Sequence, residues 1–273
     1  MNISINIKGT LMDLSKPKVM GILNVTPDSF SDGGRYVTKQ SALKQALKMI
    51  KEGADIIDVG GCSSRPGAED VSEQEELERV VPIIEAISKE ISVPISIDTF
   101  RSYVAKEAVK AGASLVNDIS AGEDDINMIK TVALLKVPYI AMHKKGSPKN
   151  MQNNPKYNDV VEGVFTFMLN KKKDCLDAGI KDFIIDPGFG FGKTLEHNYQ
   201  LLNNLEHFKL LNCAILAGVS RKSMIYKPLG LEPSDAINGT TFLHAIALQN
   251  GANILRVHDV KEAVECVQLY QLI

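Results

Sequence analysis

The chain has 273 residues, of which 44% are hydrophobic and 23% charged, and its formal net charge is −2 at pH 7. These values are typical of an ordinary globular protein, and they give no electrostatic footprint for nucleic acid or for an anionic membrane. The four cysteines form no C-x-x-C pair, and neither a signal peptide nor a membrane-spanning stretch can be seen, so we expect a cytoplasmic protein without a zinc or redox motif.

Residues 1–14 alternate weakly between apolar and polar and predict a short hairpin ahead of the main fold. One unit then recurs along the chain: a helical pattern ends at a glycine, and a short apolar run follows. Four such units can be read directly, around Gly53, Gly112, Gly179 and Gly251. Each glycine is predicted to follow the end of a helix, where a positive φ costs little only for glycine.

Eight short apolar runs are too short for helices and too apolar for half-exposed strands, so we interpret them as parallel strands covered on both faces. They lie at residues 19–23, 56–59, 95–97, 115–116, 139–142, 183–185, 214–217 and 254–257. Amphipathic stretches lie between most of them. This pattern predicts a (β/α)8 TIM barrel, as one domain over residues 1–273, with a doubly wound open sheet as the alternative.

Polar side chains follow these strands, and in a barrel such residues share one face, where active sites are built. One group, Asp98, Asn117, Asp186 and Lys222, can hydrogen-bond the edge of a heterocycle. A second group, Arg65, Arg256 and His258, can neutralise phosphates, for which arginine is favoured. Arg256 and His258 are two residues apart and therefore point the same way from their strand.

The stretch at residues 183–193 is the most distinctive part of the chain. Three apolar residues run into Asp186, and a proline, three glycines alternating with two phenylalanines, and Lys193 follow. A carboxylate that ends a buried strand needs a partner, and the glycines allow the backbone to approach a ligand. The ending Gly-Lys-Thr is not a phosphate-binding P-loop, because position 187 is proline where that motif requires glycine.

Simpler interpretations remain for each residue taken singly. Asp186 could cap a backbone amide, Asp98 and Thr99 could cap the next helix, and Arg256 could pair with Asp259. Asn117 and Asp118 could be turn residues. Four of the histidines are interpreted as structural, because none has metal-ligand spacing: His143, His197, His207 and His244. The joint appearance of polar residues at the ends of successive strands favours a site.

Several motifs together resemble the dihydropteroate synthase family. Residues 20–34, MGILNVTPDSFSDGG, are similar to its first signature, and residues 58–67, DVGGCSSRPG, to its second. The match is completed by SIDT at 96–99, Asn117 and Asp118, DPGFGFGK at 186–193, GVSRKS at 218–223 and RVHD at 256–259. The resemblance therefore covers the chain from about residue 20 to residue 259.

This resemblance implies an enzyme of folate biosynthesis that joins 4-aminobenzoate to (7,8-dihydropterin-6-yl)methyl diphosphate, with Mg²⁺ as cofactor, and that is a sulfonamide target. The implied partners are these small molecules and a second copy of the chain in a homodimer. The implied pterin-binding residues are Asp98, Asn117, Met142, Asp186 and Lys222, and Asn24 is implied at the metal and diphosphate site with Arg65, Arg256 and His258. The residues implied around the aminobenzoate are Phe30, Ser64, Arg65, Pro66, Phe191, Ser220 and Lys222. The catalytic set implied is Asp98, Asp186, Lys222, Arg256 and His258.

The chain departs from the family pattern at two places. Cys62 and Ser64 stand where the family usually has glutamate and threonine, and Lys144 and Lys145 replace a methionine and a variable residue. Three other functions stay open from the residues alone: a pterin-binding methyltransferase, an aldolase with Lys222 as Schiff-base nucleophile, and an inactive pterin-binding paralogue. We also expect the first two loops, residues 24–34 and 60–67, to form the aminobenzoate site only once diphosphate is bound.

Overall fold

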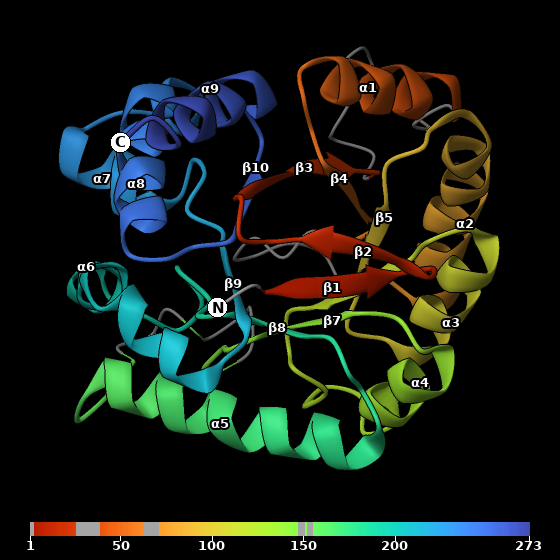
Figure 1. Cartoon of the computed structure of the whole chain (residues 1–273), viewed down its shortest axis with the longest axis horizontal. Coiled ribbons are helices and arrows are strands. Elements are labelled where there is room, and N and C mark those ends of the chain that lie inside the picture. The colour runs from red at the N-terminus through yellow and green to blue at the C-terminus, as the bar shows by residue number, and fades with distance from the viewer. Residues whose placement is uncertain (1–2, 26–38, 63–70, 147–150, 152–154) are drawn as a thin grey trace.

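The computed structural model describes residues 3–25, 39–62, 71–146, 151 and 155–273. Its centre is a closed barrel of parallel strands in the order β10-β3-β4-β5-β6-β7-β8-β9 (Figure 1). The strands are β3 (Lys18–Asn24), β4 (Ile56–Gly60), β5 (Ile95–Asp98), β6 (Leu115–Asp118), β7 (Tyr139–Met142), β8 (Phe183–Asp186), β9 (Ala214–Ala217) and β10 (Ile254–Val257). The predicted TIM barrel is confirmed.

Helices surround the barrel between successive strands (Figure 1). They are α1 (Lys39–Lys51), α2 (Glu73–Glu90), α3 (Ser102–Ala111), α4 (Met128–Leu135), α5 (Val160–Ala178), α6 (Leu195–Asn203), α7 (Ser223–Leu229), α8 (Ile237–Gln249) and α9 (Val260–Tyr270), with 3-10 helices η2 (Leu205–Leu211) and η3 (Pro233–Asp235). The four glycines expected after helices all have positive φ, from 97° at Gly251 to 131° at Gly112. Among the described residues, none of these helices combines the length and apolarity needed to cross a membrane.

The predicted hairpin is also confirmed. Strand β1 (Ser4–Ile7) pairs antiparallel with β2 (Thr10–Asp13), and the pair lies across one end of the barrel (Figure 1). Its Ile5 and Ile7 pack in one buried cluster with residues from the amino-terminal parts of the strands, such as Met20, Ile56 and Leu115. The hairpin therefore closes this end with apolar side chains, and polar residues are left to occupy the other end.

The side chains of each strand alternate between the barrel interior and the helices. On β8, Ile184 belongs to the interior cluster, whereas Phe183 and Ile185 pack with the helices. The same alternation aims Asp186 inward, two residues after Ile184. Several strands run further than predicted, because main-chain pairing continues into polar residues, as in the pairs Gly60 with Asp98 and Met142 with Asp186.

Candidate active site

Four polar side chains from four strands form one buried cluster inside the barrel, towards the carboxyl ends of the strands. The Nε of Arg256 lies 2.6 Å from Oδ2 of Asp58, and its Nη2 lies 2.5 Å from Oδ2 of Asp98. The amide of Asn117 donates to the same Asp58 oxygen at 3.0 Å. Asp58 is fully buried and Asp98 is 13% exposed, so the guanidinium compensates two carboxylates that have little contact with water.

Asp58 was missed as a site residue in the sequence, although it shares the Ile-Ile-Asp pattern of residues 184–186. It lies inside β4 and not at its end, and it faces the same interior as Asp98 and Asn117. Burial raises the pKa of Asp98 to about 7. The positive charge of Arg256 opposes this rise, and the negative charge of Asp58 adds to it. The pKa of Arg256 is raised, because its attraction to Asp58 and Asp98 outweighs burial.

Asp186 and Lys222 form the second part of the site. The Oδ1 of Asp186 accepts a hydrogen bond from the backbone N–H of Gly188 at 2.8 Å. Asp186 therefore caps a backbone amide, as one interpretation predicted, and its side chain also points into the barrel. The Lys222 ammonium donates to the carbonyl oxygen of Phe189 and lies 4.7 Å from the ring centre of Phe191. Burial lowers the pKa of Lys222 to about 8, against the attraction of Asp186.

Met142 lies at the end of β7, paired in register with Asp186, and is 3% exposed. A Cβ added at Gly188 would stand 3.2 Å from its Cγ, so the thioether chain packs against the start of the β8–α6 loop. Flat apolar surface from Met142 and hydrogen-bonding groups from Asp186 and Asn117 are thus brought to the same end of the barrel.

The loops after β9 and β10 are joined by two side-chain pairs. The Ser220 hydroxyl lies 3.0 Å from Nδ1 of His258 and accepts from the His258 backbone N–H at 3.2 Å. Arg221 forms a two-fold ion pair with Asp259, with Nε–Oδ2 at 2.8 Å and Nη2–Oδ1 at 2.5 Å. Arg221 has a φ of 54°, which is strained for a residue with a side chain. The three successive side chains have different partners: Ser220 contacts His258, Arg221 contacts Asp259, and Lys222 contacts Phe189.

Asn24 ends β3 at the open end of the barrel. A Cβ added at Gly60 would be 3.7 Å from the Asn24 carboxamide oxygen and 3.6 Å from Oδ2 of Asp98, so the glycine leaves space between the two. Carboxamide oxygens are ligands that Mg²⁺ accepts, usually with water and substrate phosphates completing its shell. Among the described residues, no group of three His, Cys, Asp or Glu side chains is placed to hold a metal.

One of the simpler interpretations is wrong: Arg256 does not pair with Asp259, whose partner is Arg221. Two others are right for one residue only. Thr99, and not Asp98, accepts from the Arg101 backbone N–H at 3.2 Å, directly before α3. Asp118 is a turn residue that points out of the barrel and accepts from Ser120, Gly122 and Tyr139, whereas Asn117 faces the site.

Phe30, Ser64, Arg65 and Pro66 lie outside the described residues. Cys62, beside this segment, receives a contact of 3.5 Å from Arg101. Arg101 also pairs with Glu76, which is fully buried. A carboxylate therefore already occupies the neighbourhood in which the family usually carries glutamate at position 62. Lys144 is engaged by Asp124, and the Lys145 ammonium lies 4.3 Å from the ring centre of Tyr157.

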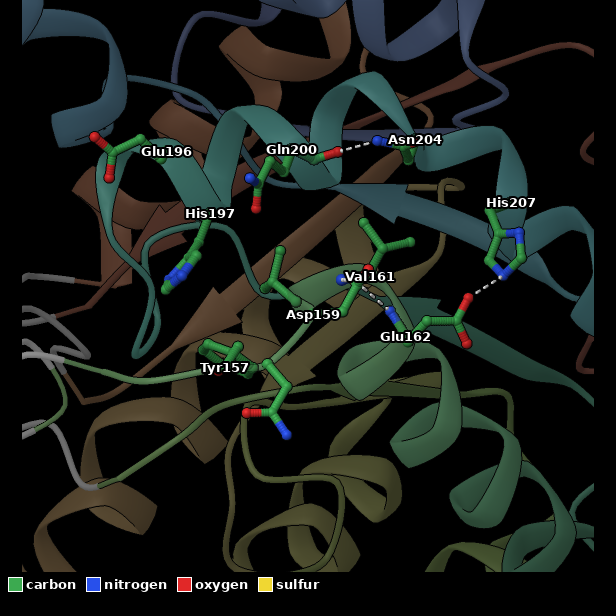
Figure 2. Close-up of a pocket in the computed structure, with 11 residues that line it drawn as sticks. Tyr157, Asp159, Val161, Glu162, Glu196, His197, Gln200, Asn204 and His207 are labelled. Carbon is green, nitrogen blue, oxygen red and sulfur yellow. Dashed lines mark hydrogen bonds and ion pairs between the residues drawn. The ribbon is translucent and has the colours of Figure 1, made fainter.

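A separate polar cleft of about 690 Å³ lies between the start of α5 and helix α6 (Figure 2). His207 and Glu162 form an ion pair of 3.4 Å at one side of it, and Tyr157 and His197 lie at the other (Figure 2). None of the predicted site residues lines it. The strand-end cluster, and not this cleft, gathers the residues that the sequence predicted.

Comparison with known proteins agrees with this geometry. The family model described as pterin binding enzyme matches residues 20–258. The dihydropteroate synthase of Escherichia coli strain K12 is 47% identical over 266 residues, which cover 97% of this chain and 94% of that protein. The Yersinia pestis dihydropteroate synthase, solved in a sulfonamide drug complex, is 44% identical with a TM-score of 0.94, over 99% of this chain and 98% of that one.

The Xanthomonas albilineans dihydropteroate synthase, solved with 4-aminobenzoic acid, is 41% identical with a TM-score of 0.93, over 100% of this chain and 98% of that one. Identity at this level extends over almost the whole length of each relative, and the resemblance first read from the motifs is confirmed. The chain belongs to the dihydropteroate synthase family of pterin-binding transferases.

Proposed function

We propose that this chain condenses (7,8-dihydropterin-6-yl)methyl diphosphate with 4-aminobenzoate at the open end of its barrel, giving 7,8-dihydropteroate and diphosphate. The observation that carries the proposal is the set of charged groups around Arg256. Three carboxylates, Asp58, Asp98 and Asp186, face the two cations Arg256 and Lys222. With all five ionised, the floor of the site has one negative charge in excess, which suits a ligand that becomes cationic.

The pterin is assigned to this floor. Asp186 and Asn117 offer an acceptor and an amide to the ring edge, and Asp98 offers a second carboxylate next to Arg256. Lys222 donates from the opposite side, and Met142 lies along the ring face. Hydrogen bonds to charged side chains hold a planar ligand more strongly than hydrogen bonds to neutral side chains do. Asp58 does not need to touch the pterin, because its assigned role is to orient Asn117 and Arg256.

The diphosphate is assigned to the rim. The Ser220 hydroxyl accepts from the His258 backbone, so its own proton is available to Nδ1 of the same histidine. This arrangement favours the tautomer that carries its proton on Nε2, a donor for a phosphate oxygen. Arg256 uses Nε and Nη2 for carboxylates, which leaves Nη1 for the ligand, and Arg65 is assigned a further phosphate contact.

Asn24 is the residue assigned to Mg²⁺, together with oxygens of the diphosphate and water. When bound, the ion would withdraw charge from the leaving group. The remaining roles belong to the side chains. The aminobenzoate is assigned to a site above the pterin, bounded by Phe191, Ser220 and Lys222 and by four residues outside the described part of the chain: Phe30, Ser64, Arg65 and Pro66.

The reaction needs one bond to break and one to form. The C–O bond between the pterin methylene and the diphosphate breaks, with the electron pair leaving on oxygen, and the arylamine nitrogen bonds to the methylene carbon and then loses a proton. Asp98 and Asp186 stabilise positive charge on the ring as it develops, and His258 and Arg256 stabilise the departing anion. The arylamine is neutral near pH 7, so a strong general base is not required.

We further propose that the protein works as a cytoplasmic, single-domain enzyme that forms a homodimer. Leu229 packs against Gly239 of α8, and Phe242 lies one turn further along that helix. With Leu231, these side chains are 40 to 65% exposed and give α7 and α8 an apolar surface that a second copy could cover. Phe242→Glu should shift the mass measured by light scattering towards the monomer, whereas Leu134→Glu on α4 should not.

One assay tests the function. Purified protein is mixed with dihydropterin diphosphate, with and without 4-aminobenzoate and Mg²⁺, and released diphosphate and dihydropteroate are measured. We expect both products only when all three are present. Diphosphate without dihydropteroate, or neither product, would point to a different reaction or to an inactive pterin-binding protein.

A further inference from the structure

Lys193, at the end of the loop between β8 and α6, is a buried lysine that the assigned reaction does not use. It is 2% exposed, and its ammonium nitrogen is 2.9 Å from the Gly188 carbonyl oxygen, 3.1 Å from that of Phe191 and 3.3 Å from that of His143. It is also 2.9 Å from Nδ1 of His143. A lysine is almost never buried so completely unless its ammonium group is satisfied.

The partners of Lys193 are acceptors. Burial lowers the pKa of His143 to about 2, so its ring is neutral and Nδ1 can accept a hydrogen bond from the lysine. Burial also lowers the pKa of Lys193, but only the protonated amine has three hydrogens to offer to these four acceptors. The three hydrogens of an ammonium suit this set of acceptors, and they join Gly188 and Phe191 of the β8–α6 loop to His143, which directly follows β7.

The loop lies directly on the segment after β7. A Cβ added at Gly188 would stand 1.9 Å from the His143 carbonyl oxygen, and one at Gly192 would stand 2.2 Å from that of Lys145. Both glycines have positive φ, 72° and 65°. The loop is also held from outside, because the Tyr157 hydroxyl donates to the Gly192 carbonyl oxygen at 3.0 Å.

The same loop presents two groups to Lys222. The Phe189 carbonyl oxygen accepts from the Lys222 ammonium, and the Phe191 ring lies under it at 4.7 Å. Asp186, by contrast, has its backbone held by strand pairing with β7 and touches the loop through one hydrogen bond, from the Gly188 N–H. Movement of the loop would therefore displace Phe191 and loosen Lys222, while Asp186 and Asn117 stayed in place.

We propose that Lys193 is a positioning residue for the reaction: its buried ammonium fastens the β8–α6 loop to the end of β7 and so places Phe191 and Lys222 around the 4-aminobenzoate. This assignment rests on the proposed aminobenzoate site. Its consequence is selective, since loss of the lysine should weaken the use of 4-aminobenzoate more than the binding of the pterin.

Lys193→Met keeps the length and apolar volume of the side chain and removes the ammonium. We expect the KM for 4-aminobenzoate to rise about tenfold or more, with less than about threefold change in the affinity for a pterin ligand measured by calorimetry. The alkaline limb of the pH profile of kcat/KM should also move to lower pH, because Lys222 loses an acceptor that favours its charged form. Lys172→Met is the matched control, since this lysine donates to the Leu211 carbonyl oxygen at 2.5 Å, away from the site.

Tyr157→Phe provides a second variant, because it removes a single hydrogen bond from the outer side of the same loop. We expect a smaller change in the same direction, and this result is decisive if Lys193→Met does not fold. The inference is overturned if the folded variants keep the KM for 4-aminobenzoate and the alkaline limb of the wild type, or if pterin affinity falls equally. Failure of the wild-type protein to release diphosphate would instead refute the proposed function.

Discussion

Arg256 offers the sharpest test of how the site is held together. It contacts Asp58 and Asp98 at 2.6 and 2.5 Å, and its side chain is 20% exposed. Arg256→Met removes the guanidinium and leaves two carboxylates close together with little access to water. Breaking a buried ion pair from one side costs about 3–5 kcal/mol in general. We expect this loss in the free energy of unfolding, which is a large part of the about 5–15 kcal/mol of a typical protein.

Removing the charge of Asp58 as well tests whether an unpaired carboxylate causes the loss of stability. Asp58→Asn added to Arg256→Met should recover part of the lost stability, because an unpaired buried amide costs less than an unpaired buried charge. Without Arg256, whose charge lowers it, the folded-state pKa of Asp98 should rise further. An acid whose pKa is raised by folding makes stability fall as pH increases, so the deficit of the single variant should be larger at about pH 8 than at about pH 6.

Urea unfolding followed by circular dichroism measures these differences in the wild type, both single variants and the double variant. Lys89→Met is the control, because the ion pair of Lys89 with Glu85 has both side chains more than half exposed and should contribute at most about 1 kcal/mol. A loss below about 1 kcal/mol for Arg256→Met, or a double variant no more stable than the single one, would refute the reasoning.

Other predictions concern ligands. Asp186→Asn should weaken pterin binding by about 1.5–3 kcal/mol, measured by calorimetry, and unchanged affinity would remove Asp186 from the pterin edge. Asp98 carries its negative charge only when ionised and Lys222 its positive charge only when protonated, so kcat/KM should fall below pH about 7 and above about 8; a flat profile would contradict both roles. Arg256→Ala should weaken the diphosphate-bearing substrate more than free pterin; equal weakening would mean that Arg256 only shapes the pocket. In titrations, 4-aminobenzoate should bind much more tightly once pterin, diphosphate and Mg²⁺ are present; equal affinities would mean a preformed site.

The barrel could be predicted because its strands are covered on both faces. A parallel strand between helices and a filled interior must be apolar throughout, and a glycine marks the preceding helix end, so both signals are local in sequence. The short helices α6 and α7 were not predicted. Helix α6 begins with a capping box between Thr194 and His197, in which histidine takes the place usually held by glutamate or glutamine.

The site was predictable where a residue ends a strand, and less so where its meaning depends on a distant partner. Asp186 and Asn117 follow apolar runs, and this position alone places them at the open end. Asp58 lies within a strand, and the residue that makes its burial tolerable is 198 positions away. Ser220 and His258 were assigned to different ligands, yet they share a hydrogen bond across 38 positions. Pairing of this kind follows from the closed barrel, which no local pattern encodes.

The distribution of charge also bears on the order of events. The excess of carboxylates lies on the buried floor, whereas His258 is exposed at the rim beside Ser220. A ligand that becomes cationic at one end and releases an anion at the other is therefore stabilised in one orientation, with the pterin inward and the diphosphate outward. In that orientation the pterin lies beneath the place assigned to the aminobenzoate. We infer that the diphosphate substrate enters first, because an aminobenzoate already held by Phe191 and Lys222 would stand in the path of the pterin.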